Sequence, residues 1–144
     1  MNNSTDGLFE GYADELIAFV QELVRLESVS DHEGDVARCV QKKMQELGYD
    51  EAFIDGTGNA AGRIGSGKKT VLFDSHMDTV EPGDAKDWKH PPFGGEIHGG
   101  RLYGRGSVDM KSALAASVYA PAILKKAGLA GKTVWVTGTV CEEY

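Results

Sequence analysis

Cysteine is scarce in this sequence, and long apolar runs are absent. The two cysteines, Cys39 and Cys141, stand far apart, whereas a disulfide framework uses more cysteines at closer spacing. We therefore expect two free thiols in a reducing compartment. Residues 1–7 lack the basic and apolar regions of a signal peptide, and no run of about 18 apolar residues is present to span a bilayer. These absences predict a cytoplasmic protein without a membrane partner.

Basic residues are also in short supply. They number 15 against 22 acidic residues, which gives a formal net charge of -7 and a pI near 5.0. Because nucleic-acid-binding domains carry excess basic charge, this balance argues against a nucleic-acid partner. The hydrophobic share of 41% is ordinary for a globular protein, and 144 residues suffice for one domain with a core. The totals predict one acidic globular domain and identify no function.

The N-terminal third has apolar side chains at steps of three and four residues, which predicts two amphipathic helices. The first is expected over residues 8–27. Ser30 and Glu33 fit a capping box, in which each side chain accepts a hydrogen bond from a free backbone N–H at the start of the second helix. Gly48 supplies the left-handed residue that ends this helix.

Short apolar segments between turn residues predict strands at residues 51–54, 60–64, 70–73, 96–98, 101–103 and 133–140. A two-residue glycine turn joins the fourth and fifth of these in a hairpin. The 70–73 run is continuously apolar, which is typical of a strand buried on both faces. A third helix is expected from Asp109, as its N-cap, to Gly128, with a kink at Pro121. This alternation predicts an α/β fold with a mixed, mostly parallel sheet.

His76 and Asp78 directly follow the 70–73 strand. In extended chain, residues two apart share a face, so the two side chains can point the same way. A metal-bound imidazole usually donates its other N–H to a carboxylate, which fixes the ring's tautomer and orientation. The pair is therefore a candidate metal ligand with its orienting carboxylate. The alternative is an ordinary surface histidine and aspartate at a strand end.

Two further acidic positions occur where predicted elements meet loops. Asp109 follows a glycine-rich approach and could bridge two cations with its two oxygens, while the alternative is a plain helix N-cap. Glu142 and Glu143 follow the last apolar strand. Metal-assisted hydrolysis needs one carboxylate as ligand and another as proton carrier, and this pair could supply both. A solvated acidic turn is the alternative for the pair.

Residues 62–69 match the G-x-x-x-x-G-K part of a phosphate-binding loop, but this match is faulty. Lys69 stands where Ser or Thr should hold Mg²⁺, and the segment leads into a strand, which leaves no helix N-terminus for phosphate. We interpret residues 65–68 as a hairpin turn. Nucleotide binding is the weakest of the functional hypotheses.

Taken together, these motifs resemble the co-catalytic zinc hydrolase family that contains aminoacylase, glutamate carboxypeptidase, acetylornithine deacetylase and succinyl-diaminopimelate desuccinylase. The matching segments are residues 75–80, Trp88 with Pro92 and Phe93, residues 99–111, and the Glu142–Glu143 pair. The resemblance implies that residues 1–144 are the N-terminal portion of a catalytic domain, a three-layer αβα sandwich incomplete at its C-terminus. It also implies that the inserted domain, which commonly dimerises, and the C-terminal part of the catalytic domain are absent.

The resemblance further implies a role for each candidate residue. His76 would ligate one metal, Asp109 would bridge both, and Glu143 would ligate the second. Glu142 would be the general base, and Asp78 would orient the site. The complete site would hold two Zn²⁺ ions, with Co²⁺ or Mn²⁺ as possible substitutes, and would need a further carboxylate and a second histidine from later in the chain.

The implied reaction is hydrolysis of an amide or peptide bond in N-acyl amino acids or short peptides, through a metal-bridging water. The partner would be a small-molecule or short-peptide substrate, and a complete protein would be a homodimer. The alternative hypothesis is that the 144-residue chain is an inactive truncated fragment or a small non-catalytic binding module.

Overall fold

The computed structural model describes residues 6–128 and 131–144, so most of the segment inspected for a signal peptide, residues 1–5, lies outside the described residues. The chain forms helices and strands in the order α1 (Asp6–Glu10), α2 (Ala13–Arg25), α3 (Gly34–Glu46), β1 (Glu51–Ile54), β2 (Ala60–Ile64), β3 (Lys69–His76), β4 (Glu96–His98), β5 (Arg101–Tyr103), α4 (Ser112–Lys126) and β6 (Lys132–Thr139), with a 3₁₀ turn at Ala85–Asp87 and an irregular helical segment at Ser107–Lys111.

The main sheet has the strand order β1-β2-β6-β3. The β1–β2 and β2–β6 pairs are antiparallel, and the β3–β6 pair is parallel, with Val71 opposite Val134 and Ser75 opposite Gly138. The predicted α/β class with a mixed sheet is confirmed. The main sheet is partly parallel and lacks the expected excess of parallel pairs, because one of its three described pairings is parallel. Residues 65–68 are not a hairpin turn, since β6 lies between β2 and β3.

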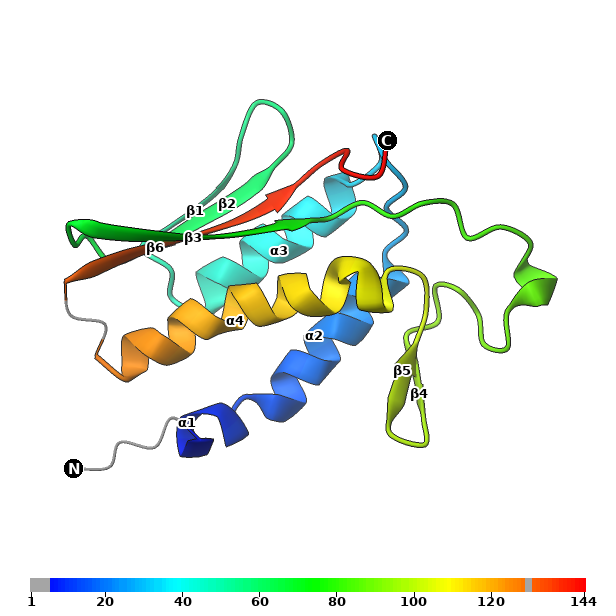
Figure 1. The fold of residues 1–144 in the computed structure, drawn as a ribbon, viewed down its shortest axis with the longest axis horizontal. Helices are drawn as coiled ribbons and strands as arrows, with labels where there is room; N and C mark the ends of the chain where they lie inside the picture. The colour runs from blue at the N-terminus through cyan, green and yellow to red at the C-terminus, as the bar shows by residue number, and fades with distance from the viewer. Residues whose placement is uncertain (1–5, 129–130) are drawn as a thin grey trace.

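Helices α2, α3 and α4 lie together on one side of the main sheet (Figure 1). Their apolar faces and the sheet form one core, whose buried members include Phe19, Leu23, Val36, Val40, Met44, Leu114, Val118, Tyr119 and Val136. The opposite face carries Phe53 and Leu72, which are 41% and 58% exposed. The described residues therefore form two of the three expected layers.

β3 does not have the burial that its apolar sequence predicted. Its residues from Lys69 to Asp74 are exposed, and only its last two, Ser75 and His76, are buried. The physical reason is the position of β3 at the edge of the described sheet. A neighbouring strand, β6, pairs with only one of its two edges. An apolar run identifies a strand, but the elements beside that strand determine how much of it is buried.

The N-terminal helices also differ from the prediction in detail. The helix expected over residues 8–27 is divided into α1 and α2. The capping box is wrong, because the hydroxyl of Ser30 donates to the Asp78 carboxylate at 2.7 Å and the Glu33 carboxylate accepts from the Cys141 N–H at 2.9 Å. Gly48 has a φ of 75°, as its predicted role in ending α3 requires.

The predicted hairpin is confirmed. β4 and β5 pair antiparallel, with Glu96 opposite Tyr103 and Ile97 opposite Leu102. Both turn glycines have positive φ, 58° at Gly99 and 76° at Gly100, which is the conformation that a two-residue turn of this kind requires. No helix in the described ranges combines the length and the apolar character needed to cross a bilayer.

Candidate metal centre

The candidate residues meet where β3 and β6 end. Because these strands are parallel neighbours, with His76 opposite Thr139, the chain leaves both strands at the same edge of the sheet (Figure 1). The peptide N–H of Met77 donates to the Thr139 carbonyl at 2.8 Å, which extends the pairing one residue further. The segments containing His76 and Glu142 are therefore brought together by the sheet itself.

His76 is held between two aspartates. Its ring is 7% exposed, with Nδ1 3.0 Å from the main-chain oxygen of Asp78 and Nε2 3.0 Å from Oδ1 of Asp109. If Nδ1 donates to the carbonyl, the Nε2 lone pair faces Asp109, which is the tautomer that a metal ligand needs. Burial alone would lower the pKa of His76, but the Asp109 carboxylate and the Asp78 oxygens raise it above its ordinary value.

Asp78 is fully buried and organises the loop that carries the two glutamates. Its carboxylate accepts hydrogen bonds from the N–H of Glu142 at 3.1 Å, from the N–H of Glu143 at 2.9 Å, and from the Ser30 hydroxyl. Burial alone would raise the pKa of Asp78, but these hydrogen bonds hold it below its ordinary value. Asp78 therefore orients His76 most closely through its carbonyl, with the carboxylate Oδ1 at 3.4 Å from the ring nitrogen.

Glu142 and Glu143 both have their backbone N–H groups held by Asp78, and their side chains reach His76. Ligand atoms of His76, Glu142 and Glu143 lie within 4.8 Å of one another. Glu143 is half-buried, and Glu142 is exposed. One nitrogen and two carboxylate oxygens at this spacing form a group that can hold a divalent cation.

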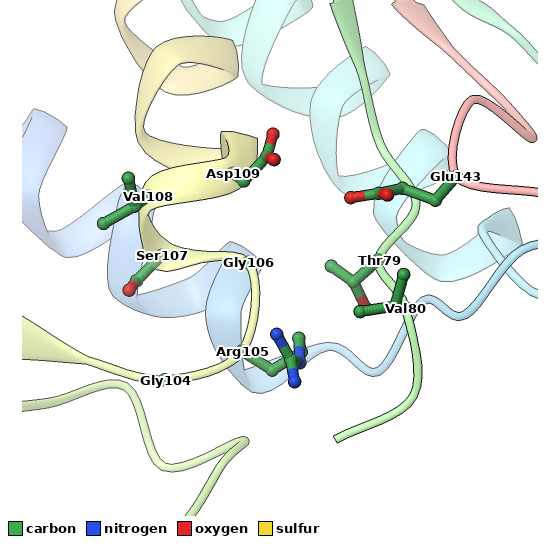
Figure 2. Close-up of a pocket in the computed structure, with 9 residues that line it drawn as sticks. All are labelled: Thr79, Val80, Gly104, Arg105, Gly106, Ser107, Val108, Asp109 and Glu143. Atoms are coloured by element: carbon green, nitrogen blue, oxygen red, sulfur yellow. The ribbon is translucent and has the colours of Figure 1, made fainter. Parts of the chain in front are cut away.

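Asp109 reaches the same place from the irregular segment before α4. Its φ and ψ of -115° and 99° are not helical, the Asp109–Met110 peptide bond is cis, and α4 begins at Ser112 with Lys111 as its N-cap. The prediction that Asp109 caps this helix is therefore wrong. Figure 2 shows the carboxylates of Asp109 and Glu143 facing each other across a pocket.

Two neighbours fix the segment that carries Asp109. Lys111 is fully buried, and its ammonium donates to the carbonyls of Leu23 at 3.0 Å and Leu26 at 2.6 Å, at the end of α2. Gly106 has a φ of 74°, and a Cβ added there would lie 2.6 Å from Cγ2 of Thr79. Glycine therefore permits both the backbone turn and the close approach to Thr79, in the segment that follows β3.

The pocket has a volume of about 410 Å³ and is lined by Thr79, Val80, Gly104, Arg105, Gly106, Ser107, Val108, Asp109 and Glu143 (Figure 2). Sequence reasoning missed Arg105 and Thr79. The Arg105 guanidinium lies 5.2 Å from the centre of the Trp88 ring, and its buried Nε has no hydrogen-bond partner among the described residues. Arg105 lies within the glycine-rich segment that leads to Asp109, and this position in the sequence could have suggested that it lines the pocket.

The residues present fit a zinc-type ion. Imidazole nitrogen and carboxylate oxygen are ordinary Zn²⁺ ligands, at about 2.0–2.2 Å from the metal. The 3.0 Å between His76 Nε2 and Asp109 Oδ1 matches the separation of two such ligands on one ion. Of the predicted ligands, Asp109 and Glu143 line the pocket, and His76 contacts Asp109 and has a ligand atom within 4.8 Å of one on Glu143.

Known proteins resemble this chain over most of its length. The uncharacterized protein YgeY of Escherichia coli strain K12 is 37% identical over 133 residues, which are 92% of this chain and 33% of that protein. Succinyl-diaminopimelate desuccinylase of Xanthobacter autotrophicus is 41% identical over 106 residues, which are 69% of this chain and 28% of that enzyme. The chain thus spans about a third of the length of the curated relatives it matches.

A solved structure shows the same arrangement of elements. The M20 family metallo-carboxypeptidase Sso-CP2 from Sulfolobus solfataricus superposes with a TM-score of 0.82 at 25% identity, over 90% of this chain and 31% of that chain. Residues 72–144 match peptidase family M20/M25/M40, and this stretch includes His76, Asp109 and Glu143. By this match over half of its length, the chain belongs to peptidase family M20/M25/M40.

Proposed function

We propose that this chain supplies part of the two-metal centre of a hydrolase that cleaves an amide or peptide bond in N-acyl amino acids or short peptides. The observation that carries the proposal is a set of short separations around His76: Asp109 Oδ1 lies 3.0 Å from its Nε2, and ligand atoms of His76, Glu142 and Glu143 lie within 4.8 Å of one another. Two relatives support the reaction class, because one is named a desuccinylase and the other a metallo-carboxypeptidase.

His76, Asp109 and Glu143 would hold Zn²⁺, with Asp109 shared by both ions and Co²⁺ or Mn²⁺ as substitutes. Bound zinc would lower the pKa of a water molecule, and it would polarise the substrate carbonyl that this water attacks. The proposal includes a further carboxylate and a second histidine from another part of a longer protein. The short span of this chain relative to its relatives supports that part of the proposal.

Glu142 would move the proton. Its side chain is exposed at the site while its own N–H is fixed by the buried Asp78 carboxylate, so the carboxylate can reach a water without loss of backbone order. It would accept the proton of the attacking water and deliver it to the leaving amine, a contribution of about 10²–10⁴ in rate. Asp78 would position both Glu142 and Glu143 without contacting substrate.

The remaining assignments follow from the same proposal. Residues 1–144 would form the N-terminal portion of the catalytic domain, and a separate inserted domain would form the homodimer. Two free thiols, Cys39 and Cys141, are compatible with a reducing, cytoplasmic location. The substrate would be a small molecule or short peptide, with no nucleic-acid or membrane partner.

The test uses a full-length form that includes the missing ligands, loaded with Zn²⁺ and assayed on N-acyl amino acids and dipeptides. Glu142→Gln should lower kcat by about 10²–10⁴ while the bound zinc and melting temperature stay the same. Glu10→Gln, an exposed change on α1, is the matched control and should leave kcat unchanged. Unchanged turnover in Glu142→Gln would exclude Glu142 as the base, and inactivity of the loaded wild type on both substrate classes would overturn the proposed reaction.

A further inference from the structure

A second group of metal-ligating side chains lies on the β4–β5 hairpin and the loop before it. Glu96 and His98 belong to β4, and His90 comes from the loop. Nδ1 of His90 is 3.3 Å from Oε2 of Glu96, and Nε2 of His98 is 2.8 Å from the same oxygen. One ligand atom from each residue lies within 4.8 Å of the other two. None of these residues belongs to the site at the ends of β3 and β6.

Local structure explains why the three side chains meet. Glu96 and His98 are two positions apart in a strand, so they share a face while Ile97 points to the other. The His90 ring stacks on the His98 ring, with centroids 4.2 Å apart and an angle of 17° between planes. Tyr103, opposite Glu96 on β5, lies 4.2 Å from the His90 ring and supports it.

We propose that His90, Glu96 and His98 form a separate binding site for a divalent cation of the zinc type. Two imidazoles and one carboxylate are the protein ligands of several zinc sites that keep an open position for water. The side chains of His90, Glu96 and His98 are 14%, 42% and 53% exposed, so an ion can reach the group from solvent.

The two ring nitrogens of His90 lie in different surroundings. Its Nε2 is buried and has no hydrogen-bond partner among the described residues. Nδ1 of His90 faces Glu96, whose negative charge would offset part of the charge of a bound dication.

The cation would fasten a loop that already has three attachments. The side chains of Gln21 and Arg25 on α2 donate to the carbonyls of Gly95 at 2.7 Å and Gly94 at 3.1 Å, and the Arg105 N–H donates to the Pro92 carbonyl at 2.7 Å. A metal joining His90 to His98 would add a link between this loop and the hairpin. β5 leads directly into Gly104 and Arg105, which line the 410 Å³ pocket. The bound cation would therefore stiffen this pocket wall, although it binds outside the pocket.

The test is a Zn²⁺ titration of the full 144-residue chain, followed through the ring resonances of its four histidines, which are His32, His76, His90 and His98. Zinc should shift the His90 and His98 resonances together, along one binding curve. The resonance of His32, an exposed histidine outside both groups, should not follow that curve. A response of His76 reports the other site and is fitted separately.

Variants assign the binding curve to these residues. Glu96→Gln and His98→Asn should each weaken the zinc response of His90 at least tenfold and leave that of His76 unchanged. His32→Asn is the matched control and should alter neither. The proposal is overturned if His90 fails to respond to zinc, or if its response survives both hairpin variants, because zinc would then bind His90 without the other two ligands. Both changes are on exposed side chains, and far-UV circular dichroism establishes that each variant is folded.

Discussion

The two histidine groups of this molecule are built in opposite ways. The group at His76 is assembled from segments far apart in sequence, with Asp109 and Glu143 brought to it by the β3–β6 pairing and by the irregular segment before α4. The group at His90 comes from nine consecutive residues and needs only one hairpin and one stacked ring. The geometry of the first group therefore depends on the global fold, whereas the geometry of the second depends on local structure.

The two groups also differ in how their carboxylates are satisfied. Asp78 is fully buried and accepts hydrogen bonds from two backbone N–H groups and one hydroxyl, whereas Glu96 is 42% exposed and contacts two rings. Removing a buried acceptor leaves its donors unpaired, while solvent replaces an exposed one. Substitution of Asp78 should therefore affect folding, whereas substitution of Glu96 should affect only binding.

The largest expected effect comes from Asp78→Ala. The change leaves the N–H groups of Glu142 and Glu143 and the Ser30 hydroxyl without their shared acceptor, the fully buried carboxylate of Asp78. The free energy of unfolding should fall by about 3–5 kcal/mol, since each unpaired buried group costs about 1–3 kcal/mol. Urea denaturation of the 144-residue chain measures it. Glu96→Ala is the comparison, and the contrast between the groups fails if the two variants lose equal stability.

Lys111→Met should have the next largest effect. It removes both hydrogen bonds to the end of α2, which fix the segment carrying Asp109, and should lower the free energy of unfolding by about 2 kcal/mol. In ring NMR spectra the His76 resonance should move, because its Asp109 partner is displaced, while those of His90 and His98 stay in place. Movement of all three would show that the hairpin depends on the core as much as the first group does.

The stability difference between wild type and Lys111→Met should also depend on pH. Burial lowers the pKa of Lys111 to about 8, below its ordinary value. Between that pKa and the unfolded value of about 10.4, the unfolded chain binds more protons than the folded chain, so stability rises with pH. The stability of the wild type relative to Lys111→Met should therefore increase from pH 8 to pH 10. A flat difference would mean that the two carbonyl acceptors keep the ammonium at its ordinary pKa.

Acid should have a smaller effect on stability, through Asp78. The hydrogen bonds to Asp78 lower its folded pKa, so its carboxylate stabilises the fold above the ordinary value of about 3.9, and this stabilisation is lost as pH falls through the lowered folded pKa. Asp78→Asn keeps the size of the side chain and does not titrate. The stability difference between wild type and Asp78→Asn should shrink from pH 5 to pH 2 in thermal melts. A constant difference would indicate that Asp78 has an ordinary pKa.

The sequence allowed the α/β class, the hairpin and the end of α3 at Gly48 to be predicted, because each depends on local pattern or on glycine conformation. The capping roles predicted for Ser30 and Glu33 were wrong, because both side chains bind partners more than forty residues away and not the nearby helix end. The burial predicted for β3 was also too high, because exposure depends on which strands lie beside it. In each case a long-range contact outcompeted a local preference.

The candidate sites show the same division. His76, Asp109 and Glu143 were identified through motif resemblance, and their spacing alone left a surface pair, a helix cap and an acidic turn as alternatives. Arg105 was missed because its contact with the Trp88 ring and its place in the pocket wall depend on how two loops meet in space. The His90 group was missed although it is local, because the stacking of His90 on His98 depends on the path of the loop, which proline and glycine residues make irregular.

The smallest expected effect provides the strictest comparison. Without metal, Glu96→Gln should leave the urea midpoint unchanged within error, because the Glu96 side chain is 42% exposed and its contacts with the two histidines are screened by water. With saturating Zn²⁺ the wild type should gain stability and the variant should gain less, since a ligand that binds only the folded state stabilises it in proportion to its affinity. A separate zinc contribution from the first group is present in both proteins and cancels in the difference. If the zinc-dependent gain is equal in the two proteins, the hairpin group is an exposed ion pair, and all zinc stabilisation belongs to the site at His76.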